Sequence, residues 1–209
     1  MKRNIIVATV LTMCFLVSQS VYAQVQETKV YKDGSKYTGQ FSGRGRKEGK
    51  GTMVWPNGNQ YEGQWLKDKP NGYGTFTYAN GIVYQGDWVD NVAKGSGTIT
   101  MPNGCVIVGE WTEMGTGTGV ATWADGTRYE GPFKDGAAHG EGLKIWPNGD
   151  RYEGSFQMGH MTGKGTCRYH DGAVYEGNWS NDMYNGHGRY VDADGTVSEG
   201  TFRAGKLVK

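Results

Sequence analysis

The chain has 209 residues, with 22 lysines and arginines against 21 aspartates and glutamates and a formal net charge of +1. A chain so close to neutral lacks the basic surface of nucleic-acid-binding proteins, so we expect no nucleic-acid partner. It is equally short of the positive charge that would draw it to an anionic membrane.

The N-terminus has the composition of a secretory signal peptide. Lys2 and Arg3 precede an apolar run from residue 5 to residue 17, and Val21-Tyr22-Ala23 forms a small-residue cleavage site. We therefore expect residues 1–23 to be removed, Cys14 with them, and the protein to be exported to the periplasm, the cell surface or the extracellular space. The alternative is an uncleaved N-terminal anchor, although the apolar run is short for a membrane span. Without Lys2 and Arg3 the net charge is −1.

From residue 37 the sequence repeats itself with a period of 22 to 24 residues. Each copy has a unit of the form Tyr-x-Gly-x-Trp/Phe, then a Gly-x-Gly pair, then an Asn-Gly or Asp-Gly dipeptide. Seven copies begin at Tyr37, Tyr61, Tyr84, Ile107, Tyr129, Tyr152 and Tyr175. Such regular self-similarity is typical of stacked repeat proteins. We expect the seven repeats to cover 37–197, between an N-terminal capping strand and turn at 24–36 and a C-terminal capping strand and tail at 198–209.

The dipeptides mark the tips of β-hairpins. In Trp55-Pro56-Asn57-Gly58, proline and asparagine suit a type I turn, and the glycine suits the left-handed residue that follows. This three-residue turn sets Met53 opposite Tyr61 and Gly49 opposite Trp65, which gathers aromatic rings and glycines on one face. At the other end of each hairpin we expect a loop of about six residues.

A lone hairpin of this kind is only marginally stable in water, so the copies must stack to fold. The predicted fold class is all-β: a single-layer, twisted antiparallel sheet of about seven stacked β-hairpin repeats, forming an elongated, solenoid-like ribbon.

The repeat resembles that of the MORN family, whose motif reads Tyr-x-Gly-x-Trp, a short loop, His-Gly-x-Gly and then Asp-Gly. The resemblance covers roughly residues 30 to 203. The histidine of the motif occurs only as His139, before Gly140, and this variability argues against a chemical role for the position. The resemblance implies a scaffold protein, and it also implies a link to phospholipid headgroups and membrane attachment.

Few residues are arranged for chemistry. The histidines have no Cys, His or acidic neighbour at zinc-ligand spacing, so we expect His139, His160, His170 and His187 in turns or on the surface. No serine or cysteine lies in a nucleophile motif. A carboxylate pair could serve glycoside hydrolysis, but one glutamate per repeat is typical of a solvated face, as at Glu62, Glu130, Glu153, Glu176 and Glu199. We expect no enzymatic activity, no metal and no cofactor.

Two cysteines remain after residue 23, Cys105 and Cys167. They lie almost three repeats apart, which is roughly 20 Å or more along a sheet with two strands per repeat. A disulfide needs α-carbons within about 7 Å of each other. Both thiols should therefore be free.

The aromatic face is the candidate binding surface. Its rings either form the core of the sheet or leave part of the face open as a groove. The candidate contact residues are Tyr61, Trp65, Trp88, Trp111, Trp123, Trp146, Tyr152 and Trp179.

We predict a non-catalytic, exported interaction scaffold that binds a protein partner through this curved face. Two alternatives remain open, a module that binds membrane phospholipid headgroups and a module that binds a cell-wall glycan. The open ends of the sheet also allow a homodimer.

Overall fold

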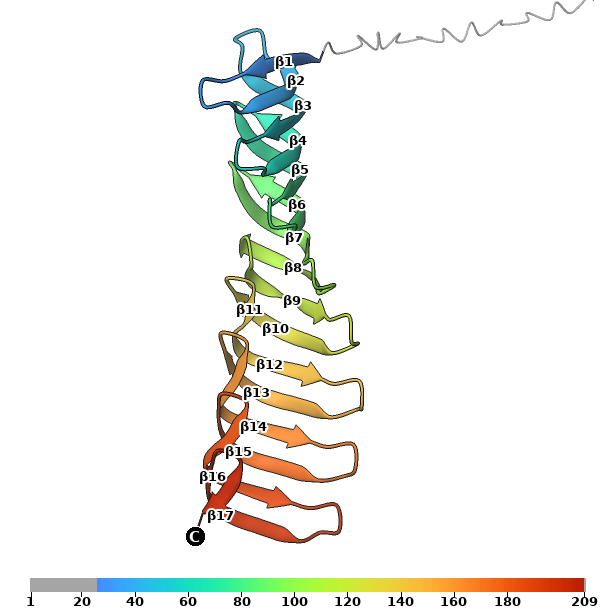
Figure 1. Cartoon of the computed structure of the whole chain (residues 1–209), viewed down its shortest axis with the longest axis vertical. Coiled ribbons are helices and arrows are strands. Elements are labelled where there is room, and N and C mark those ends of the chain that lie inside the picture. The colour runs from blue at the N-terminus through green and yellow to red at the C-terminus, as the bar shows by residue number, and fades with distance from the viewer. Residues whose placement is uncertain (1–25, 209) are drawn as a thin grey trace, which may run out of the picture.

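The computed structural model describes residues 26–208, which form one open antiparallel sheet of 18 strands. Each strand pairs with its neighbours along the chain, except that the short β11 and β12 both pair with β10, so the sheet runs in sequence order from β1 to β18 (Figure 1). The strands are β1 Glu27–Val30, β2 Lys36–Phe41, β3 Lys47–Val54, β4 Gln60–Leu66, β5 Lys69–Thr77, β6 Val83–Val89, β7 Val92–Thr100, β8 Val106–Glu113, β9 Thr116–Thr122, β10 Arg128–Lys134, β11 Ala137–Ala138, β12 Gly140–Ile145, β13 Arg151–Gln157, β14 His160–Arg168, β15 Val174–Ser180, β16 Met183–Val191, β17 Val197–Arg203 and β18 Lys206–Val208. The predicted signal peptide, 1–23, lies outside the described residues.

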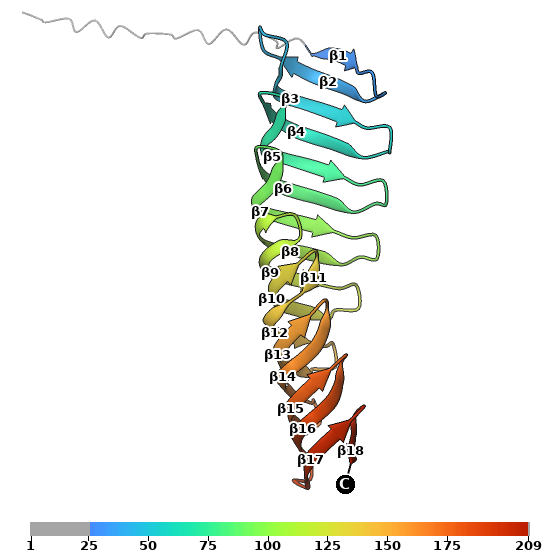
Figure 2. The ribbon, with the colours of Figure 1, turned by 90° about the vertical axis from the view of Figure 1, so that its left-hand side faces the viewer.

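The predicted all-β ribbon of stacked hairpins is confirmed. The ribbon twists about its long axis. Hairpins that are seen edge-on in the upper half of Figure 1 lie face-on in Figure 2, and the lower half shows the reverse. The cause is the fixed hand of strand twist, which accumulates from one repeat to the next. Among residues 26–208 there is no helix long and apolar enough to cross a membrane.

The three-residue turn between β3 and β4 forms as predicted. Gly58 has a φ of 85°, and the Trp55 amide donates to the Asn59 carbonyl at 2.9 Å. The Asn57 side chain accepts a hydrogen bond from the Asn59 amide at 3.0 Å, which explains the asparagine or aspartate at this position. The register places Met53 opposite Tyr61 and Gly49 opposite Trp65, so the rings and glycines do share one face. We call it the inner face.

Residues 42–46, between β2 and β3, form a loop close to the predicted length of about six residues, but the corresponding ends of the later hairpins differ from the prediction. Strand β4 runs to Leu66 and β5 begins at Lys69, so only Lys67 and Asp68 turn. These two residues have φ of 50° and 71°, as in a type I′ hairpin. A β-bulge between Gly63 and Trp65 shifts the register and bends the strand. The prediction was wrong because Lys-Asp is not the Asn-Gly pair by which such turns are recognised.

The two-residue turns stack upon one another along one edge of the ribbon, where the strand ends curl away from the sheet (Figure 2). We call these turns flaps; they are residues 67–68, 90–91, 114–115, 135–136, 158–159, 181–182 and 204–205. Six of the seven, all but the flap at 114–115, are tied to the preceding repeat by a backbone hydrogen bond, such as Asn91 N to Pro70 O at 2.9 Å. The flaps make the inner face concave.

Buried tyrosines form the centre of the core on this face. Six of them are 0% exposed: Tyr37, Tyr61, Tyr84, Tyr129, Tyr152 and Tyr175. The hydroxyl of Tyr61 donates to the Gln64 carbonyl at 3.0 Å, which holds the ring over Gly63 and Gly74. A Cβ on Gly74 would lie 2.3 Å from that hydroxyl, so the ring requires a glycine below it. Burial raises the pKa of the Tyr84 hydroxyl, in the same position of the next repeat, to about 12.

Tryptophans lock successive repeats together. Trp65 meets Tyr37 and Tyr61 edge-on, with ring centroids 5.2 and 5.1 Å away, and its Nε1 donates to the Gly51 carbonyl at 2.9 Å. One indole therefore contacts the tyrosine of its own repeat and that of the repeat before. Edge-to-face pairs of this kind are worth about 0.5–1.5 kcal/mol beyond the area they bury.

Cys105 and Cys167 are both free and both buried, so no disulfide joins them. Burial raises the pKa of each thiol, which makes both poor nucleophiles in the folded protein. We expect a chain lacking residues 1–23 to react slowly with a chromogenic disulfide reagent at pH 8. After unfolding without reductant it should release two thiols per chain. A smaller number would contradict the repeat register, because it would require a disulfide.

Candidate functional site

The eight candidate contact residues divide into two groups. Six lie in the core with 0–6% exposure: Tyr61, Trp65, Trp88, Trp111, Tyr152 and Trp179. The other two, Trp123 and Trp146, are half-buried and pack against the edge of this core. The inner face is therefore part core and part open surface, and the two groups occupy different positions in the repeat.

The open positions are those at the start of each three-residue turn. Residues there are partly exposed and flank the core along its whole length: Trp55, Tyr78, Met101, Trp123, Trp146 and Tyr169. They face the flaps across the concave inner face, and Tyr78 Oη lies 3.0 Å from Met114 Sδ of the flap at 114–115. Two pockets open between these side chains and the flaps.

The N-terminal pocket is apolar. It has a volume of about 370 Å³ and is lined by aromatic and aliphatic groups that include Trp55, Phe76, Tyr78, Trp88 and Met114. Trp55 and Phe76 lie ring against ring with centroids 5.6 Å apart. Pro70, Val92 and Ala93 complete the apolar wall beside the flap at 90–91. Nothing that carries a charge lines this pocket.

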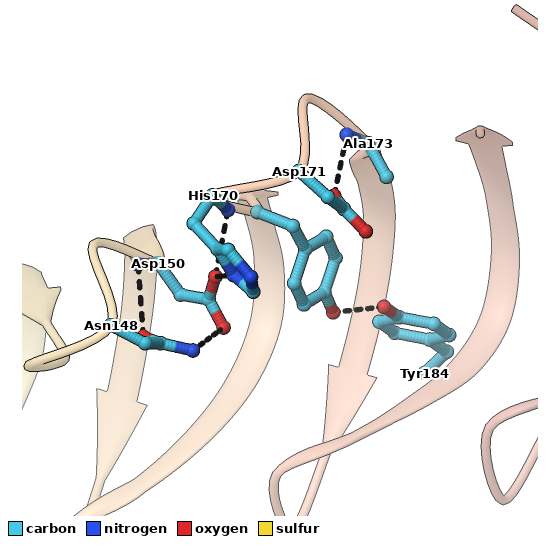
Figure 3. Close-up of polar contacts among 7 residues, drawn as sticks. Asn148, Asp150, His170, Asp171, Ala173 and Tyr184 are labelled. Atoms are coloured by element: carbon cyan, nitrogen blue, oxygen red, sulfur yellow. Dashed lines mark hydrogen bonds and ion pairs between the residues drawn. The ribbon is translucent and has the colours of Figure 1, made fainter. Parts of the chain in front are cut away.

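The C-terminal pocket is larger, about 480 Å³, and combines aromatic walls with carboxylates. Trp146 and Tyr169 come from the turn side, Trp179 from β15 and Tyr184 from β16. Tyr184 is held flat against Tyr175 with centroids 3.7 Å apart, and its hydroxyl pairs with that of Tyr169 (Figure 3). Asp150 and Asp182 also line the pocket.

Sequence reasoning missed some residues of these pockets. Trp55, Tyr78 and Tyr169 belong to the same position of the repeat as Trp123 and Trp146, so the repeat alignment contains the signal for them. Tyr184, Met114 and Asp182 carry no such signal, because they reach the inner face only through the flaps, which the sequence did not predict.

The aspartates of the C-terminal pocket also connect repeats. Asp150 accepts hydrogen bonds from the His170 amide at 2.8 Å and from His170 Nδ1 at 2.9 Å (Figure 3). Asp182 accepts from the Met161 amide at 2.8 Å and pairs with His160 Nδ1 at 2.6 Å. Both histidines are exposed, as predicted. Residues 26–208 hold no group of three or more His, Cys, Asp or Glu side chains that could bind a metal.

His170 supplies a test of this arrangement by pH. Its hydrogen bond to Asp150, and the charge of that carboxylate, raise the pKa of His170 above its usual value. Because the folded-state pKa is the higher one, the pair contributes its full stability below about pH 6.5 and loses it as the pH rises through the folded-state pKa. An NMR titration of the ring protons should show the raised pKa, and Asp150→Asn should bring it back towards the ordinary value. A His170 pKa at or below the ordinary value in the unaltered protein would contradict the pair.

The outer face carries the glutamate ladder. A hollow of about 580 Å³ on this face is lined by Glu141, Glu153, Glu176 and Glu199 among other groups. These side chains are exposed, and they pair with neighbours: Arg189 Nε lies 3.7 Å from Glu199 Oε2, and the Ser155 hydroxyl donates to Glu141 at 2.5 Å. This is the solvated polar face that the sequence predicts.

These features define a class of protein: a β-repeat ribbon whose concave inner face is filled with rings and whose turns leave two pockets. The sequence matches the MORN repeat at residues 37–60, 61–83, 84–106, 116–128, 129–151, 152–174 and 175–197. The chain therefore belongs to the MORN repeat family. In the fourth copy the match begins only at 116, and that copy has Ile107 where the others have tyrosine.

No curated protein matches the chain significantly. Among solved structures, it is similar to the TCP domain of Drosophila melanogaster SAS-4 in complex with a proline-rich motif of Ana2, at 16% identity and a TM-score of 0.43 over 86% of this chain and 92% of that one. The TCP10 domain of Danio rerio CPAP in complex with a STIL peptide gives 15% identity and a TM-score of 0.26 over 85% and 100%. A streptogramin B lyase has 12% identity and a TM-score of 0.21, over 84% of this chain and 68% of the lyase chain. Likenesses this low carry no function over to this chain.

Proposed function

We propose that the protein is a non-catalytic scaffold that binds an extended segment of a protein partner along its inner face. One observation carries this proposal: partly exposed aromatic side chains line two pockets beside a core of buried rings on the same face. Concave, mostly apolar pockets with a few polar groups are the usual binding places of folded proteins. A segment that crosses several repeats would reach both pockets. Aromatic side chains are the commonest source of binding energy at protein interfaces.

A protein partner fits this face better than an anionic lipid does. The turns that border the inner face carry aspartates, including Asp125, Asp150, Asp171 and Asp182. Carboxylates repel an anionic headgroup, and with 22 basic against 21 acidic residues the chain is too nearly neutral to offset them. Glycan binding remains the second candidate, because half-exposed Trp55 and Trp146 could stack on sugar rings.

The test is capture of a partner by the immobilised protein, with the contact mapped by a photo-crosslinking residue at position 55 or 146. A Trp55→Ala/Trp146→Ala double variant should lose at least about tenfold in affinity, since each truncated anchor costs roughly 1–2 kcal/mol or more. Tyr73→Ala is the matched control, because Tyr73 is an aromatic residue 54% exposed on the outer face. An equal loss of partner affinity in the double variant and in Tyr73→Ala would refute the protein-partner proposal. So would retention of the protein on purified cell-wall polysaccharide or on anionic vesicles in place of a protein partner.

Export is a second part of the proposal, and it depends on the composition of residues 1–23. The protein isolated from its own host should begin at Gln24, which mass spectrometry of the N-terminal peptide would show. A chain that retains Lys2 and Arg3 would refute cleavage.

Self-association through the sheet ends is the third part. β1 and β18 each pair on one side only, and Val30 and Leu207 on these strands are 68% and 44% exposed. Unpaired edge strands can add a strand from a second copy. Light scattering at increasing concentration would give the solution mass, and a strict monomer would refute the proposal.

A further inference from the structure

The two inner-face pockets differ in charge, and this difference identifies part of the partner. The N-terminal pocket is lined by no charged group, whereas Asp150 and Asp182 line the C-terminal pocket together with Trp146, Tyr169 and Tyr184. None of the residues lining the C-terminal pocket is a lysine or arginine. A cavity that combines aromatic faces with carboxylates suits a cation, because ring faces and carboxylates both attract positive charge.

The turns and flaps around the pocket are mainly negative, although Lys144 lies on the inner face beside Trp146. Towards the C-terminus the borders of the inner face are the flaps from 90–91 onward and the turn segments 101–105, 123–127, 146–150, 169–173 and 192–196. These borders carry eight aspartates and no lysine or arginine: Asp90, Asp125, Asp135, Asp150, Asp171, Asp182, Asp192 and Asp194. Both edges of this part of the face are therefore negative, although the whole chain is nearly neutral.

The turn geometry by itself does not require these carboxylates. Asp171 accepts a hydrogen bond from the amide two residues later, but Asn57 makes the same bond in its own turn. Asp150 accepts from the His170 amide of the next turn, and Asn59 makes the equivalent bond to Ala79 at 3.0 Å. An amide side chain is therefore sufficient for these two backbone hydrogen bonds, although the Asp150 carboxylate also pairs with His170 Nδ1.

The aromatic walls are fixed in place before a ligand binds. Tyr184 stacks on Tyr175 and meets Trp179 at a centroid distance of 4.8 Å, while its hydroxyl pairs with Tyr169 (Figure 3). Trp146 shows its affinity for a cation within the protein, since Lys144 Nζ lies 4.9 Å from its ring centroid. The pocket volume of about 480 Å³ falls within the usual range of roughly 300–1,000 Å³ for ligand pockets.

We propose that the C-terminal pocket receives the guanidinium of an arginine from the bound segment, while an apolar side chain of that segment enters the N-terminal pocket. This inference rests on the proposed function. Arginine suits the pocket better than lysine, because a planar guanidinium stacks on a ring and donates to carboxylates at the same time. The partner is therefore an extended segment with an apolar residue towards one end and arginine towards the other.

The experiment uses the chain without residues 1–23 and a glycine-serine peptide whose only charged group is one central arginine, at 0.15 M salt. Binding is followed by NMR at the Trp146 indole. The same peptide with citrulline has nearly the same shape and no charge, and it should bind roughly tenfold more weakly, as expected for loss of charge-assisted hydrogen bonds. The lysine peptide should also bind more weakly.

The Asp150→Asn/Asp182→Asn double variant should bind the arginine peptide roughly tenfold or more weakly than the unaltered protein. Asp68→Asn is the matched control, because Asp68 occupies the flap position of Asp182 in an N-terminal repeat and should change affinity less than about twofold. Equal binding of the citrulline peptide, or no effect of the double variant, would overturn the inference. The inference would also be overturned if the protein bound phosphatidylcholine vesicles and the arginine peptide did not compete with that binding.

The two proposals can fail separately. If partner capture depends on Trp55 and Trp146 but the two aspartates do not affect it, the arginine pocket is wrong and the scaffold function stands. If capture depends on neither the aromatic residues nor the aspartates, both proposals fail. The citrulline comparison uses the unaltered protein, so it tests the arginine pocket even if the aspartate variant does not fold.

Discussion

Gly74→Ala should lower the free energy of unfolding by about 3 kcal/mol, at the upper end of the usual cost of overpacking a core. A methyl group on Gly74 would lie 2.3 Å from the hydroxyl oxygen of Tyr61 and 2.6 Å from its Cζ. The ring cannot withdraw, since Trp65 and Trp88 hold it edge-on with centroids 5.1 and 5.2 Å away. Urea unfolding followed by circular dichroism would measure the loss.

Gly43→Ala is the matched control for this substitution. Gly43 lies in the loop between β2 and β3, and a Cβ there would meet no atom within 4 Å. Neither Gly43 nor Gly74 has a left-handed backbone conformation, so neither substitution strains the backbone, and the two differ in the space available to the methyl group. The control should stay within about 0.5 kcal/mol of the unaltered protein. Equal unfolding midpoints for the two variants would show that the tyrosine does not lie over Gly74.

Trp65→Ala should cost about 3–5 kcal/mol of stability, while Trp55→Ala in the preceding repeat should cost at most about 2 kcal/mol. Trp65 is 4% exposed, contacts two tyrosines and donates to the Gly51 carbonyl, and all of this is lost with the indole. Trp55 is half-buried at the wall of the N-terminal pocket. Urea unfolding and partner affinity should be measured on both variants.

The two variants should show opposite patterns. Trp65→Ala acts on folding, and Trp55→Ala acts on partner affinity with a small change in stability. A Trp55→Ala variant as unstable as Trp65→Ala would assign Trp55 to the core. The N-terminal pocket would then be a packing defect and not a binding place.

Much of the fold could be predicted from the repeated residues. Asn57-Gly58 fixed the turn type, the turn type fixed the register, and the register placed Met53 opposite Tyr61, as the structure has it. The two-residue flaps could not be predicted, because Lys67 and Asp68 take left-handed conformations that their sequence does not favour. The structure supports this turn through a backbone hydrogen bond from the Asp68 amide to the Lys47 carbonyl of the preceding repeat, at 3.1 Å.

The candidate site was harder to predict than the fold. The repeat alignment grouped Trp65 with Trp146 as rings on one face, yet one is core and the other borders a pocket. Exposure depends on how far the flap of a later repeat reaches over the face, as when Met114 meets Tyr78. A pattern within one repeat cannot report contacts between repeats.

The sequence by itself determined that this protein is a β-ribbon of stacked hairpins, which face carries the rings and which carries the glutamates. These properties follow from alternation along each strand and from turn chemistry, and both are local. Only the tertiary structure decided which rings are covered, where the two pockets open, and that Asp150 and Asp182 share one of them. The physical reason is the bend at each bulge, which brings the flap of one repeat against the turn of another.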